Sequence, residues 1–295
     1  MLPGGGVTRG RDAMAELIVL SHYQVRPLLQ AREAGAASAE ISPDLNRTTV
    51  RVSIEPDGAV FPGGERLRWE DAETIAASDN TCYLLEQGEV RAIKVFSEVT
   101  NWVRTLYPTR NAPTTLVSGL TMHRISGTDP WQDTLNKIRA ASPVVGHVLD
   151  TATGLGYTAI EAAKTAERVT TVEIDPAALE LARLNPWSQE LFDNPKIEQV
   201  IGHVWDVIEE QDDDTYTTII HDPPAFSLAG ELYSGDFYAE LYRVLRRKGR
   251  LFHYIGDPDS RTVQRTTQGV IRRLHEAGFT KVTPKPRAFG VLAQK

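Results

Sequence analysis

The C-terminal half of the chain alternates strand-like and helix-like segments, and this alternation restricts the fold more than any other feature. Short apolar runs rich in β-branched residues are separated by stretches with helical periodicity. The strand-like runs lie at residues 147–150, 168–173, 197–201, 216–222 and 250–254. A helix is expected over 261–277, followed by a closing strand pair at 281–283 and 289–293. Strands that alternate with helices predict a parallel sheet covered on both faces, a doubly wound α/β fold.

The first part of the chain has a different pattern of short β-like segments. Strands are expected at residues 49–54, 82–85 and 90–96, and a helical stretch is expected at 69–77. Residues 107–113 are rich in turn formers. We therefore predict a small β-rich N-terminal domain over 1–113 and a larger domain over 114–295. Residues 114–142 lead into the larger domain with a hairpin that turns near Gly119 and a helix that opens at Asp129-Pro130.

Composition excludes several classes of protein. With 41% hydrophobic and 24% charged residues the chain is typical of a globular protein, and it has no uninterrupted apolar run of the roughly 18 residues that cross a membrane. The net charge of -7 argues against broad attachment to nucleic acid or anionic lipid. The single cysteine, Cys82, excludes an intrachain disulfide, and the first residues lack a signal-peptide pattern, so a cytoplasmic location is expected.

A glycine-containing loop follows the first strand of the alternating region. It reads Asp150-Thr151-Ala152-Thr153-Gly154-Leu155-Gly156-Tyr157, and Glu173 ends the next strand about 20 residues on. The glycines fit a dinucleotide fingerprint, in which an acidic residue at the second strand end binds ribose hydroxyls. However, a carboxylate at Asp150 would repel a diphosphate and would suit an ammonium group. S-adenosylmethionine carries such a group, and a nicotinamide or flavin enzyme is the less favoured reading.

From these motifs, residues 143–295 resemble the class I S-adenosylmethionine-dependent methyltransferases. The resemblance implies a Rossmann-like seven-stranded sheet in a methyltransferase catalytic domain and implies that S-adenosylmethionine is the cofactor. The family often has Gly-Asp after the third strand, whereas this chain has Gly202-His203, so His203 or Asp206 is expected to meet adenine. The resemblance suggests the following cofactor-binding residues: Asp150, Thr151, Ala152, Gly154, Gly156, Tyr157, Glu173, Ile174, His203, Asp206 and Asp222.

A second motif, His221-Asp222-Pro223-Pro224-Ala225-Phe226, ends the fourth strand. Asp222 could position an amine nucleophile or accept its proton, and His221 could act as a general base or serve as a hydrogen-bonded wall residue. The motif resembles the Asp-Pro-Pro-aromatic sequence of amino-methyltransferases, although Ala225 comes before the aromatic residue. We predict Asp222 and His221 as catalytic residues. No metal site is predicted, because His221 and His253 lack a third ligand at suitable spacing.

Residues 228–238 resemble the segment after the active-site loop of polyamine aminopropyltransferases such as spermidine synthase. Those enzymes use decarboxylated S-adenosylmethionine and carry an acidic residue between the last glycines of the loop, where this chain has Leu155. Methyl transfer is therefore the better reading. The layout as a whole is similar to a group of predicted, largely archaeal methyltransferases. Residues expected to face the acceptor are His123, Arg124, Asp129, Pro223, Phe226 and Tyr233.

The sequence thus predicts an S-adenosylmethionine-dependent methyltransferase with an unidentified acceptor. The acidic net charge slightly favours a small amine or other metabolite over RNA. An RNA-binding face stays open, because basic residues cluster at 243, 246–248, 250, 261, 265, 272 and 273. The alternatives are an aminopropyltransferase, a nicotinamide-dependent oxidoreductase, and a binding module without turnover. The sequence is also compatible with a homo-oligomer.

Overall fold

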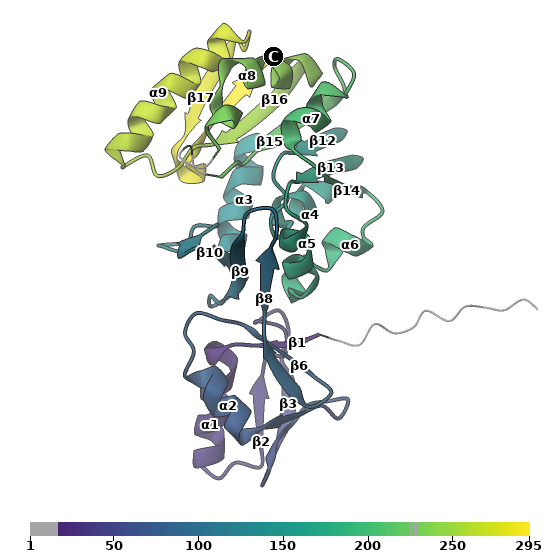
Figure 1. Cartoon of the computed structure of the whole chain (residues 1–295), viewed down its shortest axis with the longest axis vertical. Helices are drawn as coiled ribbons and strands as arrows, with labels where there is room; N and C mark the ends of the chain where they lie inside the picture. The colour runs from purple at the N-terminus through teal and green to yellow at the C-terminus, as the bar shows by residue number, and fades with distance from the viewer. Residues whose placement is uncertain (1–16, 225, 227–228) are drawn as a thin grey trace, which may run out of the picture.

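A seven-stranded sheet is the frame of the C-terminal part of the molecule. The computed structural model describes residues 17–224, 226 and 229–295. The strand order is β14-β13-β12-β15-β16-β18-β17, in which β18 runs antiparallel to both of its neighbours and the other pairings are parallel (Figure 1). The strands span His147–Asp150 (β12), Arg168–Glu173 (β13), Ile197–Ile201 (β14), Tyr216–His221 (β15), Leu245–Tyr254 (β16), Lys281–Lys285 (β17) and Gly290–Gln294 (β18). The predicted doubly wound seven-stranded fold is confirmed.

Alternate residues of the central strands supply two separate cores. Val148 and Ile220 point to one face of the sheet, and their neighbours Leu149 and Ile219 point to the other. The first core contains residues of α3, α4, α5 and α6, and the second contains residues of α7, α8 and α9. These helices span Pro130–Ala141 (α3), Tyr157–Ala163 (α4), Pro176–Arg183 (α5), Glu190–Asp193 (α6), Val204–Glu209 (α7), Gly235–Val244 (α8) and Arg261–Glu276 (α9).

Asp-Pro pairs begin two of the helices that flank the site. Asp129 caps α3 by accepting hydrogen bonds from the backbone N–H groups of Trp131 and Gln132, both at 3.0 Å. Asp175 caps α5 by accepting one from Ala177 at 3.0 Å. In both cases proline occupies the first turn, where its missing N–H costs no hydrogen bond. The local sequence therefore determines where these helices begin.

The N-terminal part has its own small core. Two antiparallel sheets, ordered β1-β6-β7 and β2-β3-β4-β5, enclose apolar side chains together with two helices. Val25 and Leu28 of the first helix and Ile75 of the second are fully buried there. The elements are Ile18–Leu20 (β1), His22–Glu33 (α1), Ser38–Ile41 (β2), Val50–Glu55 (β3), Gly58–Val60 (β4), Arg66–Arg68 (β5), Trp69–Ala76 (α2), Tyr83–Glu86 (β6) and Glu89–Ala92 (β7). The expected β-rich N-terminal region is present.

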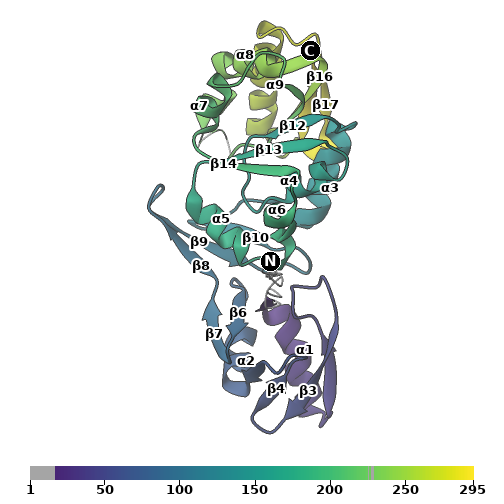
Figure 2. The ribbon, with the colours of Figure 1, turned by 90° about the vertical axis from the view of Figure 1, so that its right-hand side faces the viewer.

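A third antiparallel sheet, ordered β11-β10-β9-β8, joins the two parts of the chain. Its strands are Lys94–Ser97 (β8), Trp102–Tyr107 (β9), Thr114–Val117 (β10) and Leu120–Thr121 (β11). The β8–β9 hairpin packs beside α5 (Figure 2). The sheet includes residues from both sides of position 113, so a division into folding units at that point stays a prediction. Among the described residues, no helix has the length and apolar character needed to cross a bilayer.

Some sequence predictions fall outside the described residues. They concern the N-terminal residues 1–13, Ala225 in the proline loop, and the first residue of the segment at 228–238.

Candidate active site

The residues predicted to form the site gather where the strand order of the central sheet reverses. β12 and β15 are adjacent, but the chain continues from β12 to β13 on one side and from β15 to β16 on the other. In open α/β sheets, ligands bind in the crevice at this position. Asp150 ends β12, Glu173 ends β13, and Asp222 directly follows β15. The three carboxyl groups that the sequence singled out therefore lie along one edge of the sheet.

The loop after β12 requires glycine for two different reasons. Gly154 and Gly156 have φ angles of +52° and +78°, a region in which a side chain is strained. A Cβ atom on Gly156 would lie 2.6 Å from a methyl carbon of Leu191, so this residue lets the loop pack on α6. A Cβ atom on Gly154 would meet no atom within 4 Å, so this glycine leaves open space beside the loop.

Glu173 links the glycine loop to the start of α5. One carboxylate oxygen accepts a hydrogen bond from the Gly154 N–H at 2.9 Å, and the other accepts one from the Asp175 N–H at 3.0 Å. Asp175 is in turn held by Arg104 of β9, with 2.6 Å between guanidinium nitrogen and carboxylate oxygen. Burial raises the pKa of Glu173 above its ordinary value. Because each carboxylate oxygen has two acceptor positions, both can still accept from the hydroxyls of a ribose.

Asp150 is fully buried and only partly satisfied. Its Oδ2 atom accepts a hydrogen bond from the Thr171 hydroxyl at 2.9 Å, whereas its Oδ1 atom has no hydrogen-bond partner among the described residues. Burial, reinforced by the nearby carboxylate of Asp222, raises the pKa of Asp150 to about 8. A buried acceptor without a donor is costly, and in folded proteins it is typically satisfied by a bound ligand, ion or water molecule.

The groups on this side of the crevice suit the polar parts of S-adenosylmethionine. The unpartnered oxygen of Asp150 can accept from an ammonium group, and the positive charge of that group would favour the ionised carboxylate. Glu173 can accept from ribose hydroxyls, and the space beside Gly154 lets a ligand approach the backbone. These residues therefore fit the cofactor that the sequence predicts.

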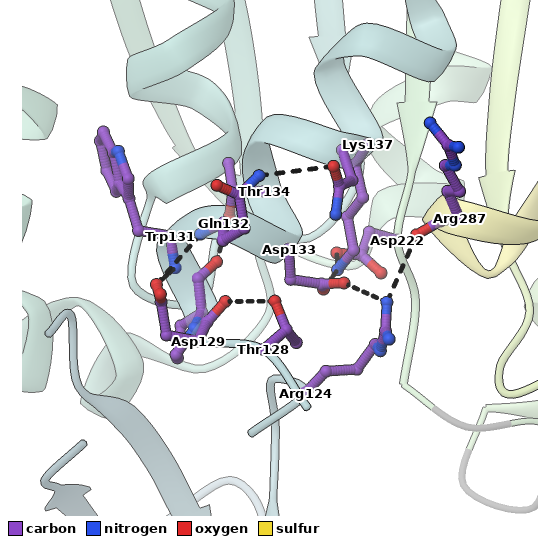
Figure 3. Close-up of polar contacts among 12 residues, drawn as sticks. Arg124, Thr128, Asp129, Trp131, Gln132, Asp133, Thr134, Lys137, Asp222 and Arg287 are labelled. Carbon is purple, nitrogen blue, oxygen red and sulfur yellow. Dashed lines mark hydrogen bonds and ion pairs between the residues drawn. The ribbon is translucent and has the colours of Figure 1, made fainter. Parts of the chain in front are cut away.

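On the other side of the crevice, four charged side chains alternate in sign. Lys137 of α3 forms ion pairs with Asp222 at 2.6 Å and with Asp133, one turn earlier, at 3.1 Å. Arg124, from the loop before α3, donates to Asp133 at 2.9 Å. Figure 3 shows the four side chains close together between that loop and the helix. Burial tends to lower the pKa of Lys137, but the two carboxylates outweigh it and raise this pKa above its ordinary value.

His221 is held by hydrogen bonds at both ring nitrogens. Its Nδ1 atom lies 2.8 Å from the Thr151 hydroxyl, and its Nε2 atom lies 3.0 Å from the backbone carbonyl of Leu232. The carbonyl can only accept, so Nε2 carries the proton and Nδ1 accepts from Thr151. Burial lowers the pKa of His221 to about 4. This setting suits a neutral residue that orients the end of β15, and the catalytic role of His221 stays a prediction.

The other residues predicted to bind the cofactor differ in accessibility. Thr151 is buried, and its hydroxyl is hydrogen-bonded to His221. Ala152 follows it in the glycine loop. Tyr157 is buried, with its hydroxyl donating to the Pro113 carbonyl at 2.9 Å, so a contact with the cofactor would have to come from its backbone. Ile174 is exposed at the end of β13.

The two alternatives for the adenine contact lie near the end of β14. His203 caps α7, where its Nδ1 atom accepts from the Trp205 N–H at 3.2 Å. Asp206 is exposed in the first turn of the same helix. Neither position decides between the two, and both stay predictions.

The residues predicted to face the acceptor come from three loops. His123 is bonded through Nδ1 to the Thr114 hydroxyl at 2.9 Å, and Asp129 is occupied as the cap of α3. Pro223 follows Asp222. The Phe226 ring is half exposed and packs edge-on against Tyr233, with 5.3 Å between the ring centres. The Tyr233 hydroxyl donates to the Pro224 carbonyl at 3.1 Å, which fixes the loop after Asp222.

Sequence reasoning missed the partners of the predicted acids. Lys137, Asp133 and Arg104 are not part of any motif, yet each forms an ion pair that holds a site residue or its neighbour. The one available signal was the spacing of Asp129, Asp133 and Lys137, which places three charged residues on one face of a helix.

Comparisons with known proteins identify a family and a relative. Residues 131–257 match the family model "Methyltransferase small domain". The chain is 42% identical over 258 residues to the uncharacterized protein MJ1233 of Methanocaldococcus jannaschii, covering 85% of this chain and 88% of that protein.

Solved structures give the same fold. A spermidine synthase in complex with the transition-state analogue AdoDATO has a TM-score of 0.54 at 20% identity, covering 66% of this chain and 70% of that one. Spermidine synthase from Thermotoga maritima has a TM-score of 0.52 at 18% identity, covering 65% and 68%. At these identities the likeness concerns the fold alone.

Proposed function

Because the chain belongs to the methyltransferase small-domain family of class I S-adenosylmethionine-dependent methyltransferases, we propose that it transfers the cofactor's methyl group to a nucleophile held beside Asp222. The observation that carries the proposal is the position of Asp222. It follows β15 at the switch point, close enough to Asp150 to affect the ionisation of that residue. An acceptor beside Asp222 would therefore meet a cofactor whose ammonium group lies at Asp150.

Different residues of the site would bind the cofactor and position the acceptor. When bound, the cofactor supplies a methyl group on a sulfonium, which is already an activated leaving group. Asp150 would hold the ammonium group of the cofactor and Glu173 would hold its ribose, which would fix the cofactor in one orientation for attack. Asp222 orients the nucleophile, and it takes the proton if the acceptor must lose one. The two prolines after Asp222 restrict the loop that carries it.

Charge ranks two classes of acceptor for testing. A small amine or other metabolite is the first class to test, because the overall charge of -7 does not attract a polyanion. RNA is the second, because basic residues occur along α9 and at the exposed start of β16. Incubating the protein with methyl-labelled S-adenosylmethionine and either a small-molecule extract or total RNA would show which fraction takes up the label.

Titration calorimetry tests the cofactor directly. We expect S-adenosylmethionine and S-adenosylhomocysteine to bind, and we expect Glu173→Gln to weaken both by about tenfold, since it replaces a charged acceptor. Glu198→Gln is the matched control, because Glu198 of β14 pairs with Arg168 of β13 near the amino ends of these strands, away from the carboxyl ends that carry the site. Binding of NAD alone would contradict the proposal.

Asp222→Asn separates binding from turnover. We expect this variant to bind the cofactor and to lose most methyl transfer, because the side chain keeps its shape but can neither accept a proton nor attract one. Equal turnover in the variant and in the wild type would remove Asp222 from the reaction.

Aminopropyl transfer is the second candidate, favoured by the resemblance of residues 228–238 to the aminopropyltransferases. Against it, the loop position that is acidic in those enzymes is Leu155, whose side chain is buried in the core. A clear preference for decarboxylated S-adenosylmethionine in the same calorimetry would select this candidate over methyl transfer.

A further inference from the structure

Lys137 is an unusual residue for its position. It is 3% exposed and is the only lysine or arginine among the described residues that is buried. Desolvation of an ammonium group is expensive unless close partners compensate it. Lys137 has Asp222 and Asp133 as ion-pair partners, and its Nζ atom lies 4.4 Å from the centre of the Tyr254 ring. A buried lysine that is paired with two carboxylates is more typical of a reaction or binding site than of an ordinary core.

The role proposed for Asp222 leaves this lysine unexplained. The Oδ2 atom of Asp222 lies 2.6 Å from the Lys137 ammonium, so only Oδ1 is left to orient an acceptor. If the pair persisted in the loaded protein, the lysine would neutralise the carboxylate that should meet the acceptor. A second anion that attracts Lys137 would resolve this conflict.

The cofactor itself contains a suitable anion. The methionine end of S-adenosylmethionine carries an ammonium and a carboxylate on one carbon atom, and an acid and a base side by side complement both charges. Asp150 supplies the acid, with its unpartnered oxygen. Lys137 supplies the base, since its ammonium lies 2.6 Å from Asp222, which directly follows β15, the strand paired with the β12 strand that ends at Asp150. Arg104, which pairs with Asp175 beside Glu173, belongs to the other end of the site.

We propose that Lys137 pairs with the carboxylate of the cofactor's methionine group in exchange for Asp222, and so makes the site select S-adenosylmethionine over its decarboxylated form. The proposal rests on the proposed function and goes further by assigning the residue that sets cofactor specificity. The decarboxylated cofactor lacks the anion and has one more net positive charge, so it leaves Lys137 on Asp222. Asp133, itself held by Arg124, keeps the lysine in place during the exchange.

Calorimetric affinities for S-adenosylmethionine and its decarboxylated form test the exchange without any acceptor. We expect the wild type to prefer the carboxylate-bearing cofactor, and we expect Lys137→Met to reduce the ratio of the two affinities by about tenfold or more. Asp222→Asn should preserve or increase the ratio, because it leaves the lysine charge without its competitor. Lys164→Met is the control, since this lysine is exposed at the end of α4 and should not alter the ratio.

A second variant guards against loss of folding. Lys137→Met leaves Asp222 and Asp133 without a cation, whereas the double variant Lys137→Met with Asp222→Asn removes both charges of the closest pair. The double variant should also lose the preference. If both variants fold, as judged by thermal denaturation, and keep the wild-type ratio, Lys137 is only a structural partner of Asp222 and the inference is wrong. If the wild type binds neither S-adenosylmethionine nor S-adenosylhomocysteine, the proposed function fails instead.

Discussion

Asp150→Asn is expected to stabilise the protein in the absence of cofactor and to weaken cofactor binding. The pKa of Asp150 rises from 3.8 to about 8 on folding, because the carboxyl group is buried next to Asp222. Between these two values the folded chain holds a proton that the unfolded chain has lost. Stability conferred at this site therefore falls as the pH rises through that window. Asparagine has nearly the same shape and does not titrate, so it removes this dependence.

The magnitude follows from the width of the window. From 3.8 to pH 7 is about three pH units, and each unit corresponds to about 1.4 kcal/mol, so the variant should gain on the order of 4 kcal/mol at pH 7. At pH 5 the expected gain is only about 1.5 kcal/mol by the same relation. The gain should level off above pH 8, where the folded carboxyl group also ionises.

Urea unfolding of both proteins at pH 5, 6, 7 and 8 measures the difference, and calorimetry with S-adenosylmethionine measures the binding. In the wild type, affinity should rise between pH 6 and 7.5, because the cationic ligand requires Asp150 to be ionised; the ligand's own amino group titrates only near 8. In the variant, affinity should be lower and nearly independent of pH. A stability difference that stays constant from pH 5 to pH 8 would refute the reasoning.

Three further predictions concern the frame of the site. Gly156→Ala should cost about 2–5 kcal/mol of stability, from left-handed strain and the clash with α6, whereas Gly35→Ala, with φ +72° and open space, should cost only about 1–2 in the same urea assay. Arg104→Met should cost about 3–5 kcal/mol, because it leaves the buried carboxylate of Asp175 without its cation, and a loss below about 1 would contradict that account. Because the pKa of His221 is lowered to about 4, the unfolded chain binds the extra proton between pH 4 and 6.5, so stability should rise with pH there; His221→Asn should flatten that rise.

The fold was predictable because the central strands are buried on both faces. Runs such as Val148-Leu149 and Ile219-Ile220 are apolar at every position, which is typical of a parallel sheet covered by helices. The closing strand pair and the helix at 261–277 also occur close to their expected bounds. The hairpin predicted near Gly119 is confirmed as the β10–β11 pair. The rest of the sheet at 94–121 was not predictable in the same way, because the turn residues at 107–113 suggested a linker, whereas β9 and β10 pair directly across them.

The site was predictable where its chemistry depends on residues within one motif. Asp150, Glu173 and Asp222 were found because each ends or follows a strand, and parallel strands bring such positions to one edge. Lys137 was not found because it lies 85 residues before Asp222, on a helix whose apolar and charged positions look like those of an ordinary surface helix. The i, i+4 spacing of Asp133 and Lys137 indicates a pair within the helix, but the pairing of Lys137 with Asp222 leaves no such signal, so only the structure reveals it.

The two central aspartates illustrate how burial can separate the roles of identical side chains. Both lie at the ends of adjacent strands, but Asp222 has a lysine at 2.6 Å, whereas Asp150 accepts from the Thr171 hydroxyl and leaves its Oδ1 atom without a hydrogen-bond partner among the described residues. A sequence selected for stability alone would not keep the arrangement at Asp150, because an unpaired buried carboxyl group opposes folding at neutral pH. Its presence is explained if the missing partner is a cation on a ligand, because binding of that cation would offset the cost of burying an unpaired carboxyl group. We therefore expect cofactor affinity to depend most strongly on Asp150, the carboxyl group whose ionisation opposes folding. A series of variants at both positions should show that only at Asp150 does a substitution raise stability while it lowers affinity.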